Sequence, residues 1–154
     1  MHFFFIIFLT LFSYQALALN FPEVGNYARY EAILHGKKYE MKKALIDYNS
    51  DQDSFTQASK MTTGDQVLED SVYQIGRQWF YTPEKVESVL KNCLRREGAP
   101  EKIEISGVLI SACTFHNMDA QLDYTIGMVP FGQLRFQLYL GRSEFLDFHL
   151  VEFN

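Results

Sequence analysis

The sequence predicts a mainly β fold of the α+β class: an antiparallel meander of about seven to eight strands with one helix packed on it. Apolar and polar residues alternate with a period of two along most of the chain. Turn-forming residues interrupt this alternation at intervals of roughly 8 to 15 residues. Only residues 82–94 carry apolar side chains at the helical period. Because so many strands with one apolar face must bury it, we expect a strongly curved sheet or a partly closed barrel.

The N-terminal segment is expected to direct export. Residues 3–12 form an unbroken apolar run, and the small-residue sequence "ALA" at 16–18 has the pattern of a cleavage site. The run is shorter than the roughly 20 apolar residues that a membrane-spanning helix needs. We therefore expect a signal peptide over 1–18, a single β-rich domain over 19–154, no membrane span after cleavage, and a location in the periplasm or outside the cell. An uncleaved anchor stays open as the alternative, because no Lys or Arg precedes the run.

The first half of the domain is predicted to form consecutive hairpins. Ala28, Tyr30 and Ala32 fall on one face of the first strand, as the period of a half-buried strand requires. Glycine at the turns can take the positive φ that tight turns need. The predicted elements are a strand at 26–34, a turn at His35-Gly36, strands at 37–48 and 54–63, a turn at Gly64-Asp65, and a strand at 66–80 that bends near Gly76.

The helix is predicted over residues 82–94. Thr82 is a favourable N-cap, and Pro83 suits the first helical position, where no backbone N–H is required. Gly98 and Pro100 follow the segment and are typical of a helix end. The apolar stripe that would face the sheet consists of Val86, Val89, Leu90 and Cys93.

The second half of the domain is predicted to return to strands. A type I turn is expected over 129–132, with Pro130 at its second position. The last two strands form the clearest amphipathic hairpin, in which Arg135 is expected to lie opposite Asp147 and His149 and to form a cross-strand ion pair. The predicted strands are 102–115, 121–129, 133–140 and 144–153.

The two cysteines, Cys93 and Cys113, are expected to form a disulfide that fastens the helix end to the sheet. The bond would close a loop of about 20 residues and contribute on the order of 3 kcal/mol to stability. A metal site built from both cysteines and His116 is the alternative, but it lacks a fourth ligand. We therefore predict the disulfide, no metal site and no cofactor.

The acidic segment at residues 47–53 has some features of a calcium loop. Oxygen-bearing side chains occupy alternate positions, as an EF-hand requires. However, Gln52 stands where that loop needs Gly, and Ala58 stands where it needs a bidentate Glu. Asn, Asp and Ser are also the usual residues of turns. We therefore predict a hairpin loop, and weak calcium binding of another type stays open.

The charge pattern argues against binding to nucleic acid. The net charge is −5, and nucleic-acid affinity rests on clustered Lys and Arg. Short basic stretches occur, such as Lys42-Lys43 and Arg95-Arg96, but acidic residues lie close to them. We expect these stretches to be solvated faces of the domain.

The sequence also lacks the common catalytic signatures. Phosphate-loop, dinucleotide-binding, nucleophile-elbow and zinc-protease motifs do not occur. Two His/Asp pairs, His116 with Asp119 and His149 with Asp147, have no nucleophile beside them in the sequence. We therefore predict no catalytic residues and no enzyme. A hydrolase that uses His116 or His149 is the weakest alternative.

Aromatic side chains are the remaining functional signal, because a curved sheet lined by them could enclose an apolar ligand. We predict an exported, non-enzymatic domain that binds a lipid or another apolar or amphipathic small molecule in the concave face of its sheet. This layout resembles, in architecture only, that of lipocalin-like and lipoprotein-carrier-like folds. The alternative is a protein-interaction module with a filled core, an inhibitor or envelope-assembly factor whose partner is an envelope protein. The predicted ligand-binding residues are Tyr30, Trp79, Phe136, Leu138 and Phe148.

Overall fold

The computed structural model describes residues 21–117, 122–139 and 145–154, most of which lie in antiparallel strands. The first strands in the chain are β1 (Tyr27–Leu34), β2 (Lys37–Asn49), β3 (Ser54–Thr63) and β4 (Gln66–Gly76). The helix α1 (Pro83–Lys91) follows. The later strands are β5 (Ala99–Ile105), β6 (Val108–Asn117), β7 (Leu122–Gly127), β8 (Gln133–Tyr139) and β9 (Phe145–Phe153).

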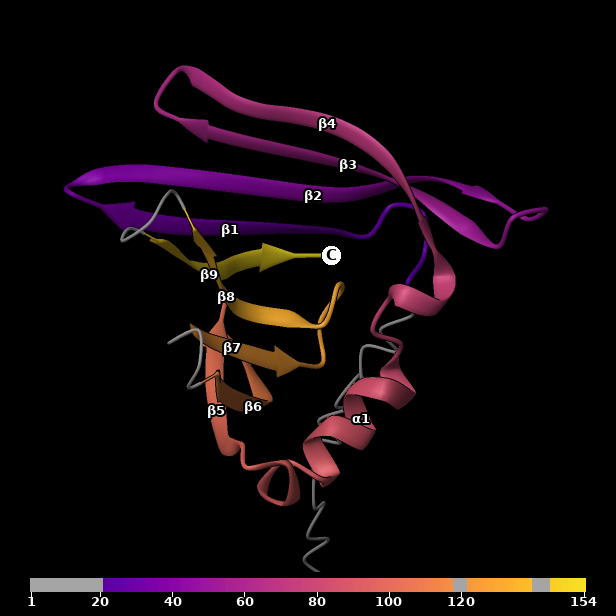
Figure 1. Cartoon of the computed structure of the whole chain (residues 1–154), viewed down its shortest axis with the longest axis vertical. Coiled ribbons are helices and arrows are strands. Elements are labelled where there is room, and N and C mark those ends of the chain that lie inside the picture. The colour runs from indigo at the N-terminus through magenta and orange to yellow at the C-terminus, as the bar shows by residue number, and fades with distance from the viewer. Residues whose placement is uncertain (1–20, 118–121, 140–144) are drawn as a thin grey trace, which may run out of the picture.

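These strands form one sheet of nine, in the order β4-β3-β2-β1-β9-β8-β7-β6-β5. The sheet therefore consists of two meanders, β1–β4 and β5–β9, joined where the first strand pairs with the last. Figure 1 shows the first meander as a long ribbon across the top and the second as a narrower group that curls beneath it, with α1 along one side. The sheet is curled and not closed, which confirms the predicted mainly β class.

The hairpins of the first meander agree with the predicted strands. His35 and Gly36 both take positive φ, 50° and 74°, in the turn between β1 and β2, as a two-residue hairpin turn requires. The predicted continuation of the fourth strand to residue 80 was wrong. Beyond Gly76 the chain turns into a short 3₁₀ segment, η1 (Arg77–Trp79), which is closed by the Phe80 amide donating to the Arg77 carbonyl at 3.1 Å.

The prediction of one strand over 102–115 was also wrong. Ser106 and Gly107 take φ values of 50° and 79°, which make a tight turn in the middle of this stretch. Ile105 and Val108 consequently pair across a hairpin instead of following one another along a strand. This extra turn explains why the sheet has nine strands where about eight were expected.

The second meander curls back on itself. Its terminal strand β5 approaches β9, and the Ser106 hydroxyl donates to the Val151 carbonyl at 3.0 Å. At the other edge of this meander, β9 pairs with β1, and Tyr30 lies opposite Leu150. The apolar core lies inside this curl and under the ribbon. Its buried members include Ala28, Tyr30, Ala32, Met41, Met61, Ile110, Leu134, Leu146, Phe148 and Leu150.

Helix α1 covers the face of β6 and β7 that this core leaves open. The Thr82 hydroxyl caps it by accepting from the Lys85 amide at 3.4 Å, as predicted. Val86 is 0% exposed and packs in a second apolar cluster with Cys113 and Ile126. The helix is shorter than predicted and ends at Lys91.

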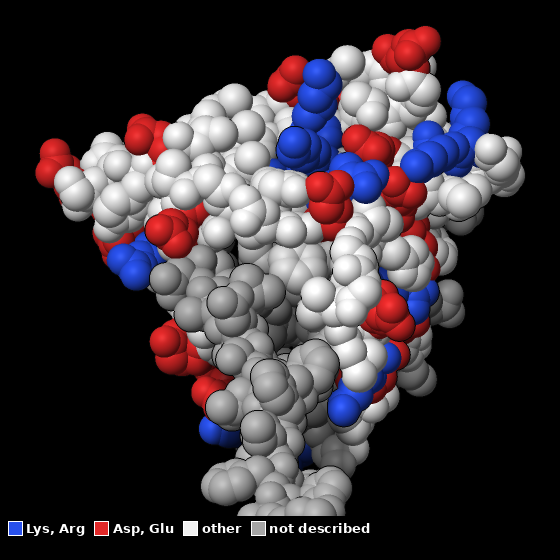
Figure 2. All heavy atoms as spheres, turned by 180° about the vertical axis from the view of Figure 1, so that it is seen from behind, with Lys and Arg blue, Asp and Glu red and all other residues white. Residues whose placement is uncertain are grey.

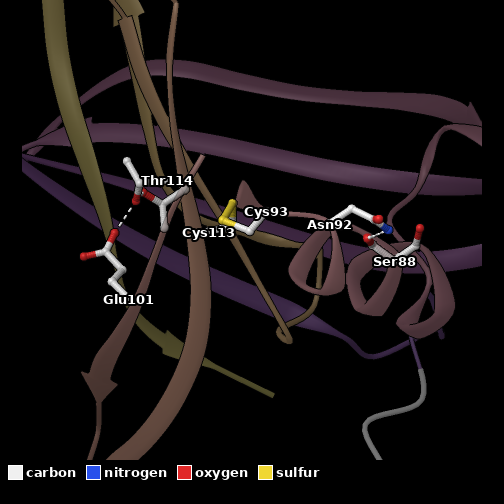
Figure 3. The surroundings of a disulfide bond; sticks show 7 residues. Ser88, Asn92, Cys93, Glu101, Cys113 and Thr114 are labelled. Carbon is white, nitrogen blue, oxygen red and sulfur yellow. Dashed lines mark hydrogen bonds between the residues drawn. A yellow bond between two sulfur atoms is a disulfide. The ribbon is translucent and has the colours of Figure 1, made fainter. Parts of the chain in front are cut away.

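The disulfide joins Cys93 to Cys113 with their Cα atoms 5.8 Å apart, which confirms the predicted pairing. Figure 3 shows Cys93 just beyond the last turn of the helix, where the Asn92 side chain donates to the Ser88 carbonyl at 2.8 Å. A Cβ atom at Gly98 would lie 2.4 Å from the Cys113 sulfur. Only glycine therefore lets the chain pass the disulfide at this point.

The surface carries both signs of charge. On the face shown in Figure 2, basic and acidic side chains lie among one another over the described part of the chain. In the described residues no helix is long and apolar enough to cross a membrane. The predicted signal peptide, residues 1–18, lies outside the described residues.

Candidate functional site

The structure brings four of the five predicted ligand-binding residues together. The rings of Phe136 and Phe148 stack at 5.3 Å, and Tyr30 meets Phe136 edge to face at 5.0 Å. Tyr30 and Phe148 are 0% exposed, and Leu138 packs against the same core. Trp79 lies apart from this group and is 77% exposed. The interior under β1, β8 and β9 is thus filled by the protein's own side chains, and a ligand site must be sought beside it.

A pocket of about 200 Å³ lies beside this packed interior, on the inner side of the ribbon. Figure 1 shows β4 running down past the end of the ribbon toward α1, and this connection supplies one wall of the pocket. The β7–β8 turn supplies the opposite side. The lining residues are Lys43, Gln57, Tyr73, Ile75, Trp79, Phe80, Tyr81, Phe131 and Gln133.

The alternation of the strands explains why polar groups reach this pocket. On β2, Lys43 lies two residues from Met41 and from Leu45, both of which are buried, so all three share the inner face. Ser59 lies opposite Lys43 on β3, and Ser71 lies opposite Ser59 on β4. The inner face is therefore apolar in the middle of the sheet and becomes polar toward its β4 edge.

Lys43 is the only lysine or arginine in the pocket lining. The expectation that it belongs to a solvated face was wrong, because its side chain is partly buried over aromatic rings. Its Nζ atom lies 4.7 Å from the centre of the Phe136 ring and 5.6 Å from that of Tyr30. Gln133 offers a carbonyl oxygen at 3.4 Å. Burial lowers the pKa of Lys43 to about 8, while the negative charge of Glu69 acts in the opposite direction.

Gln57 and Tyr73 form a second polar group in the pocket. The Gln57 side-chain amide donates to the Tyr73 hydroxyl oxygen at 2.6 Å. Gln57 is 3% exposed, so this hydrogen bond satisfies a buried donor. Burial raises the pKa of Tyr73, and the charge of Glu69 adds to this effect, so the phenol keeps its proton at neutral pH.

The aromatic wall is held by contacts outside the pocket. Phe80 meets Phe55 edge to face at 5.5 Å and lies 6.4 Å from Phe131. The Lys85 ammonium donates to the Gln78 carbonyl at 2.6 Å and to the Phe80 carbonyl at 3.0 Å. These bonds fix the path of the chain on both sides of Trp79.

The β7–β8 turn lies at the predicted place but is not of the predicted type. The Gly132 amide donates to the Val129 carbonyl at 2.9 Å, which closes the turn. Phe131 takes a φ of 66°, which a type II turn needs at this position and a type I turn does not. A Cβ atom at Gly132 would lie 2.5 Å from the Tyr81 side chain, so this glycine allows the turn to meet the aromatic wall.

A second cavity, of about 360 Å³, lies between β5 and strands β8 and β9. Its charged rim already has partners within the protein. The Arg135 Nε atom donates to Asp147 at 2.8 Å, which confirms the predicted cross-strand pair. His149 lies 3.6 Å from the same carboxylate. The apolar part of this cavity is formed by Ile103, Ile105, Leu134 and Leu150.

The residues weighed for catalysis form surface contacts. The His116 imidazole contacts the Asp123 carboxylate on the neighbouring strand. Its other expected partner, Asp119, lies outside the described residues. The hydroxyls of Thr114 and Thr125 lie 2.7 Å apart, and Thr114 also contacts Glu101 (Figure 3).

The acidic segment at 47–53 forms the end of β2 and the β2–β3 hairpin loop at 50–53, in line with the predicted hairpin. The Asn49 side-chain oxygen accepts from the amides of Asp51 at 3.0 Å and Gln52 at 3.2 Å. The Tyr48 hydroxyl donates to Asp53 at 2.7 Å. In the part of the chain that the structure describes, no group of three or more His, Cys, Asp or Glu is placed to hold a metal ion.

Comparison of the chain with protein-family models, with curated proteins and with solved structures gives no match. The function therefore has to be inferred from the pocket itself. Of its lining residues, Trp79 was among the predicted ligand-binding residues, whereas Lys43, Gln57 and Tyr73 were not. The signal that could have found Lys43 was its period-two spacing with Met41 and Leu45.

Proposed function

We propose that the protein is a non-enzymatic binding domain, exported from the cytoplasm, that holds a small apolar or amphipathic ligand in the pocket beside Trp79. The observation that carries this proposal is an exposed tryptophan beside a hollow lined by other aromatic side chains. Trp79 is 77% exposed beside a hollow that is also lined by Phe80, Tyr81 and Phe131. Exposed apolar surface of this kind favours association, because covering it stabilises the complex by roughly 25 cal/mol per Å².

The size of the pocket limits the ligand. Sites for drug-sized molecules occupy about 300 to 1,000 Å³. At about 200 Å³ this pocket suits a single ring or a short acyl chain, with Trp79 covering the part that extends outward. The disulfide supports a role outside the cytoplasm, since such bonds persist in oxidising compartments.

The single tryptophan makes the proposal directly testable. Because Trp79 is the chain's one Trp and lines the pocket, its fluorescence should change when an amphiphile is titrated into the purified full-length protein. Mass spectrometry of organic extracts of natively purified protein should identify a co-purified small molecule. Protein that is always empty, with no emission change for any amphiphile tested, would contradict the proposal.

A matched pair of variants separates the pocket from general surface hydrophobicity. Trp79→Ala should weaken amphiphile binding about tenfold or more in calorimetry, because one pocket wall is lost. Leu109→Ala removes another exposed apolar side chain, 61% exposed at the distant β5–β6 hairpin, and should leave the affinity unchanged. Equal losses in both variants would indicate non-specific adsorption.

A second candidate function, a protein-interaction module, is favoured by the edge of the sheet. Strand β4 ends the sheet, and Val72 on it is 61% exposed. Exposed edge strands can accept an additional strand from a partner. If this is the function, a partner captured from envelope extract by the wild-type protein should be lost with Val72→Lys but retained with Trp79→Ala. The opposite pattern would exclude the edge.

A further inference from the structure

We infer that the ligand of this pocket is an anion: an apolar body that carries one carboxylate or phosphate group, bound against the ammonium of Lys43. The inference rests on the proposed function and specifies which amphiphiles the site selects. It follows from the position of one positive charge and from the lack of an ion-pair partner for it among the described residues.

The described residues give the Lys43 ammonium only part of the charge and hydrogen-bond partners that it requires. A partly buried ammonium is costly unless an opposite charge and hydrogen-bond acceptors surround it. Among the described residues, no carboxylate lies within the 4.0 Å of an ion pair with its Nζ atom, and Gln133 provides the only hydrogen bond, at a long 3.4 Å. The Phe136 and Tyr30 rings offset part of the cost by cation–π attraction. A bound anion would supply the missing charge.

The pocket lining holds a second donor, the hydroxyl group of Tyr73. The Tyr73 hydroxyl oxygen accepts from Gln57, so its own proton remains to be donated. No acceptor in the described part of the chain takes this proton. Lys43 and Tyr73 both line the pocket and can both donate to one anionic group.

The nearest internal competitor is Glu69 on β4. Its charge raises the pKa of Lys43, so the two groups interact at a distance. However, its carboxylate is engaged by the Ser71 hydroxyl at 2.9 Å, and its side chain is exposed to water. Glu69 therefore does not complete the site, and replacing it with Gln should strengthen anion binding.

Three ligands with the same chain test the inference: octanoate, 1-octanol and octylammonium, each titrated calorimetrically into the full-length protein at pH 7. We expect octanoate to bind about tenfold or more tightly than octanol, and octylammonium to bind weakest. With Lys43→Met, octanoate should lose this advantage while octanol binding stays, because methionine keeps the apolar stem. Lys43→Arg should retain the preference for the anion.

Each outcome has a distinct meaning. Equal affinity of the wild-type protein for octanoate and octanol would overturn the inference and leave the proposed function intact. If none of the three ligands bound, the proposed function would fail and the inference with it. If Lys43→Met kept the preference for octanoate, another group would be the anion site and the assignment to Lys43 would be overturned. Circular dichroism on each variant confirms that the comparison is made between folded proteins.

A pH series gives an independent readout. The wild-type affinity for octanoate should be constant near pH 7 and should fall above pH 8, as the ammonium loses its proton, until it approaches the affinity of the Lys43→Met variant. The other titratable groups around Lys43 are Tyr30, Tyr73, Tyr81 and the carboxylate of Glu69. Burial raises the pKa of all three tyrosines, so they stay neutral over this range. Octanol affinity should not change, and a parallel fall for octanol would contradict the assignment.

Discussion

Strands β5–β9 and the ribbon β1–β4 belong to one sheet, but the side chains on their inner faces differ. In the second meander, helix α1 and the disulfide cover β6 and β7, and apolar side chains pack most of the curl, beside the cavity between β5 and strands β8 and β9. In the ribbon, the inner face ends in Lys43, Gln57 and Tyr73 around an open pocket. Since both regions have the same alternating strands, the difference lies in which inward positions are polar. The filled region supplies stability, and the polar, open one supplies a place for a ligand.

The largest effect should come from removing a side chain of the filled region. Phe148 is 0% exposed and stacks on Phe136, so Phe148→Ala should lower the free energy of unfolding by about 3 to 5 kcal/mol. Trp79→Ala, at the open pocket, should change it by less than about 0.5 kcal/mol. Urea denaturation of both variants measures the contrast. Similar losses would show that the two regions do not differ.

Removing the disulfide should have the next largest effect. Replacing both Cys93 and Cys113 by Ala should cost about 3 kcal/mol, because the cross-link restricts the unfolded chain. Hydrogen exchange should accelerate mainly in α1 and β6, and much less in β2 and β3. A change limited to the amides that exchange by global unfolding, with no additional acceleration in α1 and β6, would contradict the local role of the disulfide.

At the pocket, a substitution should increase stability. Lys43→Met removes a partly buried charge that has no ion-pair partner among the described residues, and should raise the free energy of unfolding at pH 7 by about 1 to 3 kcal/mol. Binding sites commonly cost stability in this way. Lys42→Met, on the exposed side of the same strand, is the matched control and should have little effect. A destabilised Lys43→Met would mean that the lysine serves the fold.

The stability gained by Lys43→Met should depend on pH with a defined sign. The pKa of Lys43 is about 8 in the folded protein, compared with an ordinary value of 10.5 that applies to the unfolded chain. Between these values the unfolded chain holds more protons, so the lysine becomes less costly as the pH rises. The advantage of Lys43→Met should be complete below pH 8 and vanish near pH 10.5. Chemical denaturation of the wild-type protein and Lys43→Met across this pH range measures the advantage. An advantage that grows with pH would contradict the prediction.

The smallest effect should come from the outer face. Arg135 and Asp147 form a partly exposed pair across β8 and β9, with side chains 31% and 27% exposed. A double-mutant cycle with Arg135→Gln and Asp147→Asn should give a coupling of about 0.2 to 1 kcal/mol. The coupling should weaken in high salt. A value of several kcal/mol would place this pair among the structural determinants of the curl.

Much of the fold could be predicted because alternation and turn residues are local signals. Ala28, Tyr30 and Ala32 are buried as their spacing predicts, and Thr82 caps the helix. The Ser106-Gly107 turn escaped prediction because β-forming residues continue on both sides of it. The positive φ of Ser106 and Gly107 and the pairing of Ile105 with Val108 identify it in the structure.

The pocket was harder to predict, because it combines segments that are distant in the sequence. Trp79 could be identified by its type, but its separation from Tyr30 and Phe148 depends on how the chain leaves β4. Lys43 was assigned to a solvated face as part of a short basic stretch with acidic residues close by, although Lys42 and Lys43 point to opposite sides of β2. That no carboxylate of the described residues forms an ion pair with Lys43 is a property of the folded sheet, and sequence spacing does not encode it.

The central claim is that the hollow beside Trp79 is the binding site and that the second meander, with its cavity beside β5, is not. The most direct measurement is the change in backbone amide chemical shifts of isotope-labelled protein on addition of octanoate at pH 7. The largest changes should fall at Gln57, Tyr73 and Phe131, with little change at Ile103 and Ile105 of the cavity beside β5. Changes confined to β5, β8 and β9, or no changes at saturating octanoate, would contradict the account.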